Sequence, residues 1–228
     1  MCSVFPAARR WRRFWLPAGA FAGALLSMLL VFGLAHGRGG WTTSRLLLTG
    51  VVLASGWSAV ISFLLAIGPE QTLRSMLFWL MGDLSEARWP GAAAVALIFG
   101  LLVAMVLARS LNLLARGEIE AGMLGVAVGK LRVALFFLAS LLTATAVTLA
   151  GSVGFVGLVV PHLLRLLIGG DHRLLLPASV AVGGSFLVLA DTLARTVAAP
   201  QQLPVGVLSA FIGVPLFLYL LRRSGVRA

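Results

Sequence analysis

The eighteen residues VALFFLASLLTATAVTLA at positions 133–150 contain no charged side chain. A helix rises ~1.5 Å per residue, so a run of this length matches a hydrocarbon core of roughly 30 Å. A second uncharged run, LLLTGVVLASGWSAVISFLLAI, occupies positions 46–67. Both runs predict helices that cross a lipid bilayer.

The composition of the whole chain supports the same conclusion. Its 228 residues are 60% hydrophobic and 11% charged, whereas soluble domains are about half apolar and about a quarter charged. The fold class predicted is an all-α polytopic membrane helix bundle, forming one transmembrane domain over 1–228. Seven apolar segments are expected, at 14–35, 45–67, 90–108, 133–150, 151–168, 176–198 and 203–221.

Two segments need comment. The fifth, 151–168, is rich in glycine and interrupted by Pro161, which is typical of a short or partly re-entrant span. The linker 68–89 is bracketed by Gly-Pro and Trp-Pro pairs and has room for a short helix.

The formal net charge of +11 raises the possibility of a nucleic-acid partner. The positions of the arginines favour membrane orientation instead, because they lie in short loops between apolar runs. One set of alternate loops carries eight basic residues, and the C-terminal tail, on the same side, adds three, which gives eleven. The loops on the opposite side carry three, namely Arg74, Arg88 and Arg195. This bias predicts a cytoplasmic C-terminus.

The basic N-terminal stretch 1–13 conflicts with that orientation. An odd number of spans would place Arg9, Arg10, Arg12 and Arg13 on the disfavoured outer side. A cleaved secretory signal ending at Ala35 is one explanation, although its apolar part is long for a signal.

No motif for catalysis is present. The sequence GVAVGKL at 125–131 has three residues between its glycines, and Leu131 stands where a phosphate loop needs serine or threonine. Seven acidic residues give little material for acid–base chemistry, and Cys2 is the single cysteine. We therefore expect no enzyme activity, no metal or cofactor, and no nucleic-acid partner. Energy for any transport must come from a partner protein or an ion gradient.

Two polar features remain. The stretch RSLNLLARGEIEAGMLGVAVGKLR, 109–132, suits short helices on the cytoplasmic surface. Its length favours a docking surface for a soluble partner over a plain solvated loop. In the sixth segment, Asp191 and Arg195 stand four residues apart on one helix face, so they can form an ion pair. From spacing alone, this pair fits a functional contact and a neutralised interfacial pair equally well.

Several stretches in order and spacing resemble the FecCD-type permeases, the membrane subunits of importers for vitamin B12, haem and ferric siderophores. They are TSRLLLTGVVL (43–53), FWLMGDLS (78–85), LNLLARGEIEAGMLGV (111–126), GSVGFVGLVVPHLLRLL (151–167), GGDHRLLLP (169–177), ADTLAR (190–195) and QLPVGVLSAFIGVPLFLYLL (202–221).

The resemblance implies a permease homodimer in the bacterial inner membrane, with two ATP-binding cassette subunits and a periplasmic substrate-binding protein. ATP would be bound by the partner, and the cargo would be an iron chelate (siderophore or haem) or vitamin B12. Thr43 and Ser44 match the cytoplasmic gate, and Arg195, helped by Asp191, matches the contact with the binding protein. The implied ATPase-coupling residues are Leu114, Gly117, Glu118, Ala121, Leu124 and Gly125.

Family members usually have ten spans, and the first segment here resembles their fourth. The expectation is therefore an N-terminally truncated permease, the C-terminal part of a ten-span type II importer subunit. Two alternatives stay open: a non-transporting fragment, and an ion-coupled secondary transporter. The second would need paired inverted repeats, and no convincing repeat is visible.

Overall fold

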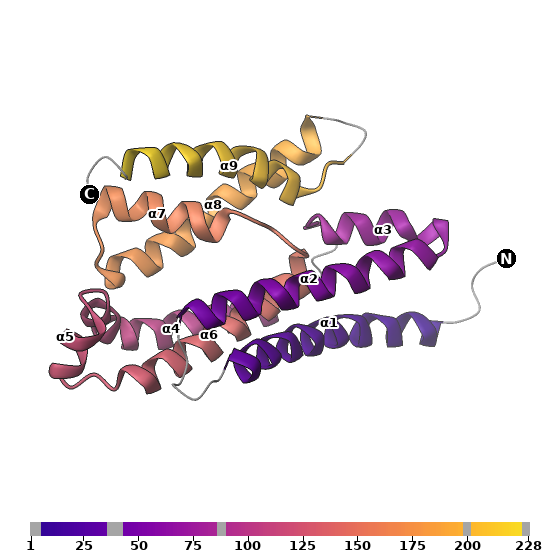
Figure 1. Ribbon diagram of the computed structural model, residues 1–228. Coiled ribbons are helices and arrows are strands. Elements are labelled where there is room, and N and C mark those ends of the chain that lie inside the picture. The colour runs from indigo at the N-terminus through magenta and orange to yellow at the C-terminus, as the bar shows by residue number, and fades with distance from the viewer. Residues whose placement is uncertain (1–5, 36–42, 86–89, 198–201, 225–228) are drawn as a thin grey trace. The chain divides into compact units, whose positions relative to one another are not determined.

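The computed structural model describes residues 6–35, 43–85, 90–197 and 202–224 (Figure 1). Within these ranges all regular structure is helical, as predicted. The helices are α1 (Pro6–Ala35), α2 (Thr43–Ile67), α3 (Glu70–Leu80), α4 (Pro90–Leu114), α5 (Glu118–Met123), α6 (Val128–Ala150), α7 (Val156–Ile168), α8 (His172–Thr196) and α9 (Val205–Ser224).

Contacts along the chain divide it into two compact units, Met1–Leu77 and Phe78–Ala228. In the first unit α1 and α2 pack on each other, and α2 exposes large apolar side chains along its length, including Leu47, Val52 and Phe63. The second unit contains α4 to α9. A single domain over 1–228 stays a prediction.

Seven apolar helices correspond to the seven predicted segments. Among the described residues, α1, α2, α4, α6 and α8 are each long and apolar enough to cross a membrane. The other two, α7 and α9, are shorter apolar helices. The fifth predicted segment is indeed short, because α7 begins only at Val156 and residues 151–155 are not helical. Between α2 and α4, α3 is the short helix expected in the linker.

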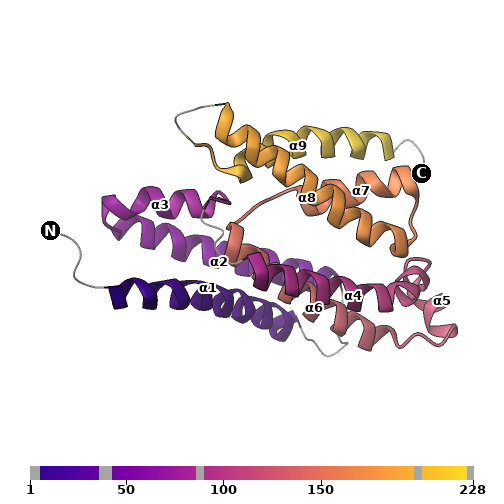
Figure 2. The same ribbon diagram turned by 180° about the vertical axis from the view of Figure 1, so that it is seen from behind.

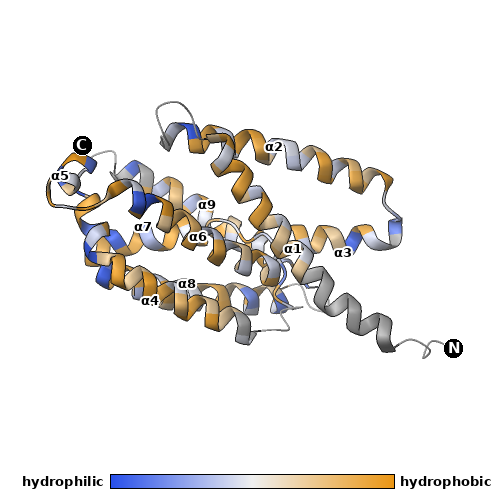
Figure 3. Ribbon diagram, turned by 90° about the horizontal axis from the view of Figure 1, so that it is seen from below, coloured by the Kyte–Doolittle hydropathy of each residue, from blue (hydrophilic) through white to orange (hydrophobic). Residues whose placement is uncertain are grey.

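The second unit buries a small cluster of Val160, Leu164 and Leu175 where α7 meets α8, together with several alanines, and exposes many other large apolar side chains. Ala108, Ala144, Ala190 and Ala194 are fully or almost fully buried, whereas Val106 is 82% exposed. Small residues let helices approach closely when lipid, rather than water, surrounds the bundle. Figure 3 shows apolar colouring along the helices and polar colouring near their ends and around α5. The chain is a multi-pass membrane protein.

In the second unit, α4 packs against α6 and α8, and α7 packs against α8 and α9 (Figures 1 and 2). The helices run alternately in opposite directions. One end, the α5 end, carries α5, the α7–α8 turn and the end of α9 (Figure 1). The other, the Arg195 end, carries the end of α8 and the start of α9, whereas α7 begins beside the middle of α9, where Phe155 lies against Gly213.

Four predicted boundaries move outward at the α5 end, where polar residues extend the helices: the ends of α4 and α9 and the starts of α6 and α8. The sequence predicts short surface helices over 109–132, whereas in the structure 109–114 complete α4 and 128–132 begin α6. Only α5 is a separate helix there. The sixth segment begins at His172 rather than 176, because the Asp171 side chain caps α8 by accepting a hydrogen bond from the Arg173 backbone N–H.

Candidate functional site

The six-residue helix α5 lies between the end of α4 and the start of α6, and one ion pair joins it to α6. The Arg132 guanidinium donates to the Glu118 carboxylate across fourteen residues of sequence. The Ala121 side chain is fully buried beneath α5. Its backbone N–H donates to Gly117 O, and its carbonyl accepts from Val126 N, each at 3.0–3.1 Å. These two bonds close the turns on either side of α5.

The outer face of α5 is apolar and uncovered. Ile119, Met123 and Leu124 are 76%, 77% and 63% exposed, in a stretch that also carries Glu118 and Glu120. Large apolar side chains on a polar segment are typical of a protein-binding surface, because water is a poor environment for them. This face can receive a partner protein.

The predicted coupling residues lie together around α5. Leu114 ends α4, and Ala121 is the buried base of α5. Gly117 and Gly125 flank α5 with φ of 148° and 84°, and at Gly125 a side chain would force a strained backbone although the space beside it is open.

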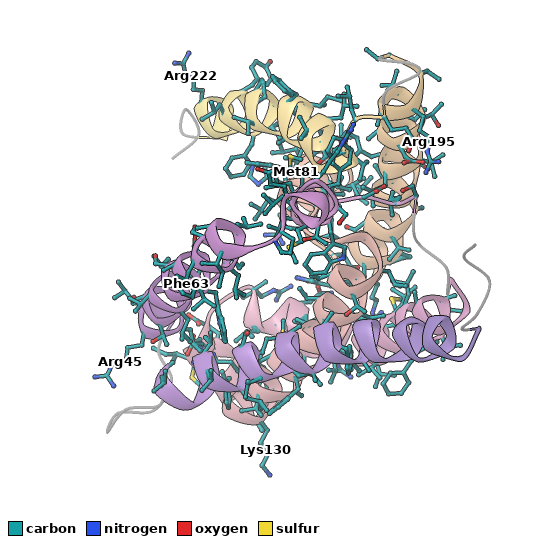
Figure 4. The ribbon with its side chains drawn as sticks, turned by 90° about the vertical axis from the view of Figure 1, so that its right-hand side faces the viewer. Arg45, Phe63, Met81, Lys130, Arg195 and Arg222 are labelled. Atoms are coloured by element: carbon teal, nitrogen blue, oxygen red, sulfur yellow. The ribbon has the colours of Figure 1, made fainter. Side chains whose placement is uncertain are left out.

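The predicted docking pair also forms, at the opposite end of the same unit. Arg195 Nε lies 2.8 Å from Asp191 Oδ2, and both side chains are partly exposed. Figure 4 shows Arg195 on α8, and Lys130 and Arg222 projecting away from the ribbon. An exposed arginine held by one carboxylate can still reach an acidic partner.

The predicted gate residues belong to the first unit. Thr43 is the first residue of α2, and Ser44 follows with an exposed side chain. Their position relative to α5 or Arg195 is not described.

Basic residues of the second unit gather at the α5 end. There, helix ends and turns carry Arg109, Arg116, Lys130, Arg132, Arg165, Arg173 and Arg222, whereas Arg195 lies at the other end. Arg38, Arg88 and Arg227 of the sequence count lie outside the described residues. The asymmetry matches the one that marks the cytoplasmic side of membrane proteins.

A polar cluster that sequence reasoning missed joins α4 to α8. Asn112 Nδ2 donates to Asp171 Oδ1 at 2.6 Å, and Asn112 Oδ1 accepts from the His172 backbone N–H at 2.8 Å. The His172 Nδ1 atom lies 2.7 Å from the same oxygen. Hydrogen bonds from the Arg173 N–H and the Asn112 amide hold the pKa of Asp171 below its usual value of 3.8. The sequence shows an Asp-His pair directly after two glycines, but nothing in it indicates that Asn112 is the residue that the pair contacts.

The Arg195 end is held differently, by backbone packed on backbone. A Cβ on Gly206 would collide with the carbonyl oxygen of Met81 and lie 3.0 Å from that of Ser152. The Asp83 N–H donates to Ala150 O at 2.9 Å, and Ser209 Oγ donates to Gly154 O at 3.2 Å.

An apolar groove of about 580 Å³ opens beside this junction along α9. Met81, Ser152, Phe211 and Val214 are among the residues that line it, and Met81 lies next to α9 in Figure 4.

Comparisons with known proteins agree with this geometry. Residues 2–223 match the FecCD transport family. The chain is 46% identical to the cobalamin import system permease of Halobacterium salinarum, over 92% of this chain and 56% of that protein. It is 41% identical to the hemin transport system permease of Yersinia pestis, over 90% and 62%. It is 40% identical to the Fe(3+) dicitrate transport system permease FecD of Escherichia coli, over 91% and 65%.

One solved structure, described as an inward-facing conformation of a metal-chelate type ABC transporter, superposes with a TM-score of 0.78 at 32% identity, covering 91% of this chain and 73% of that one. The chain spans 56–65% of the three permeases' lengths. The match over residues 2–223, together with these identities, shows that the chain belongs to the FecCD transport family.

Proposed function

We propose that the chain is the membrane-spanning permease subunit of an ABC importer in the bacterial inner membrane. It moves an iron chelate (siderophore or haem) or vitamin B12 inward, and a separate ATPase subunit binds and hydrolyses the ATP. Family membership supports transport, and the relatives named above are permeases for cobalamin, hemin and ferric dicitrate.

The observation that carries the proposal is α5. It is a separate short helix at the basic end of the bundle, joined to α6 by Glu118–Arg132 and exposing Ile119, Met123 and Leu124. An ATPase that binds α5 can displace α4 and α6 as it moves, because only a few residues separate α5 from each of these helices. In this arrangement the α5 end is cytoplasmic, and so is the C-terminus.

The remaining partners follow from the opposite end and from the family. A periplasmic substrate-binding protein docks at the Arg195 end, where Arg195 is exposed and oriented by Asp191. Two permease copies form a homodimer and enclose the pathway, and each contacts one ATPase. Thr43 and Ser44, at the start of α2, form the cytoplasmic gate.

Cysteine crosslinking tests the central contact. With Cys2 replaced by serine, Glu118→Cys and Ile119→Cys should each crosslink to the ATPase subunit in membranes. Thr192→Cys, exposed near the Arg195 end, is the matched control and should not. If a scan of 111–126 finds no ATPase contact, the proposal is wrong.

Uptake tests coupling and cargo. Labelled cobalamin, haem and ferric siderophores should be imported only with an ATPase subunit able to hydrolyse ATP. Gly125→Val should abolish uptake because it strains the turn after α5, whereas Gly122→Ala, at an open position, should keep it. Uptake that persists with an inactive ATPase would instead support an ion-coupled transporter.

A further inference from the structure

At the α4–α8 junction, a side chain of α4 forms hydrogen bonds to the start of α8, which simple packing of two helices does not require. α4 leads into α5 after only three residues, and α8 ends at the docking pair. Asn112, two residues before the end of α4, makes side-chain contacts to the first residues of α8.

The Asn112 amide uses both of its hydrogen-bonding functions on α8. Its NH₂ group donates to the Asp171 carboxylate, and its oxygen accepts the His172 N–H, one of the N–H groups that a helix start leaves without an intrahelical partner. Asp171 accepts the next N–H, that of Arg173. Two side chains, one of them 60 residues away in sequence, thus cap the same helix.

This double contact resists both separation and sliding of the two helices. Aspartate would keep the acceptor of Asn112 but put a second carboxylate beside Asp171, and leucine would keep neither function. Beyond the junction, α8 is a continuous helix of 25 residues, roughly 37 Å long at ~1.5 Å per residue. Such a helix carries a displacement from one end of the unit to the other.

We propose that Asn112 is a positioning residue that clamps α4 to α8, so that movement of α5 by the ATPase is transmitted along α8 to the Arg195 end. This inference rests on the proposed function, because it needs an ATPase at α5 and a binding protein at Arg195. It adds a connection between those two sites, carried by Asn112, Asp171 and His172.

The competing explanation is that Asn112 merely stabilises the start of α8. The two explanations differ in what restores activity. If capping matters, lost stability accounts for any defect. If the clamp matters, any short covalent link between α4 and α8 restores coupling even without the cap.

The test uses the full complex with the ATPase and binding protein, reconstituted in liposomes, with Cys2 replaced by serine. In Asn112→Ala, stimulation of ATP hydrolysis by the loaded binding protein should fall about 2- to 30-fold, the range seen for residues that carry long-range coupling. Crosslinking of Ile119→Cys to the ATPase and the affinity for the binding protein should stay unchanged. Thr145→Ala is the control, since it removes a partly buried hydroxyl that bonds only within α6, and it should keep full stimulation.

The double variant Asn112→Cys with Asp171→Cys supplies the rescue. Stimulation should be low when the thiols are reduced and should recover when a short bifunctional thiol reagent links them. Full stimulation in Asn112→Ala, or no recovery on linking, would overturn the inference while leaving the proposed function intact. Failure of every position in a cysteine scan of 111–126 to crosslink to the ATPase in the otherwise unchanged chain would remove the proposed function, and the inference with it.

Discussion

The two ends of the second unit are held together by different kinds of contact. At the α5 end, side chains bridge separate helices: Glu118 to Arg132, and Asn112 to Asp171. At the Arg195 end, the backbone at Gly206 packs against the carbonyl oxygens of Met81 and Ser152. A contact between side chains can open and reform by rotation of the side chains, while the helices stay intact. A contact between backbones can open only if the segments themselves move apart. The comparison indicates that α5 can move at its end of the unit, where Asn112 holds α4 to α8, and that the Arg195 end is rigid.

The largest effect should come from filling the backbone contact. Gly206→Ala puts a methyl group onto the Met81 carbonyl oxygen, and overpacking of this kind costs about 1–3 kcal/mol or more. Gly184→Ala, in α8 with open space around it, should stabilise its helix by roughly 0.5–1 kcal/mol. Thermal unfolding of both variants in detergent measures the difference. A Gly206→Ala chain as stable as the parent would contradict the rigid end.

The second prediction concerns the α5 end. Glu118→Arg should reduce uptake several-fold by releasing α5, yet change stability by only about 0–1 kcal/mol, because the Glu118 side chain is 60% exposed. Glu118→Arg combined with Arg132→Glu restores the pair in reverse and should recover part of the uptake. A large drop in the unfolding temperature of the single variant would mean that α5 is structural rather than movable.

The third prediction concerns docking at the Arg195 end. Arg195→Glu should weaken binding-protein affinity by up to about 5-fold at low salt, the equivalent of an exposed ion pair. The difference should shrink as salt screens the charges. Arg173→Glu, at the α5 end, is the control. Equal affinity of the parent and Arg195→Glu at every salt concentration would exclude this role.

The smallest effect should be the pH dependence of the α4–α8 contact. Because the pKa of Asp171 is depressed in the folded chain, the unfolded chain takes up the proton first as pH falls. The contribution of Asp171 to stability is therefore complete well above pH 3.8 and is lost as the pH falls below that value. The unfolding temperature of the parent relative to Asp171→Asn, followed from pH 6 to pH 3, measures it. A constant difference across that window would contradict the shift.

Local patterns predicted the local features correctly. Uncharged runs located the seven apolar helices, and four-residue spacing brought Asp191 to Arg195. The bonds between Glu118 and Arg132 and between Asn112 and Asp171 were not predicted, because each joins different helices. Which residues meet there depends on how α4, α6 and α8 pack, and helical periodicity carries no information about that. Likewise, the polar character of 109–132 predicted a short helix where α5 lies, but it gave no sign that α4 and α6 extend into this stretch.

The short α7 has a consequence for how the protein is made. Its thirteen residues span about 20 Å, less than a hydrocarbon core of roughly 30 Å, and the carbonyl of Gly154 in the preceding segment is satisfied by Ser209 of α9. Backbone N–H and C=O groups without hydrogen-bond partners are costly in lipid. Unlike α6, α7 therefore cannot enter the bilayer from the insertion machinery by itself. We expect residues 151–168 to wait until α9 is synthesised. A thiol at Val159→Cys, a position that is buried in the complete chain, should therefore react with a water-soluble reagent in chains halted before residue 205 and be protected in the complete chain.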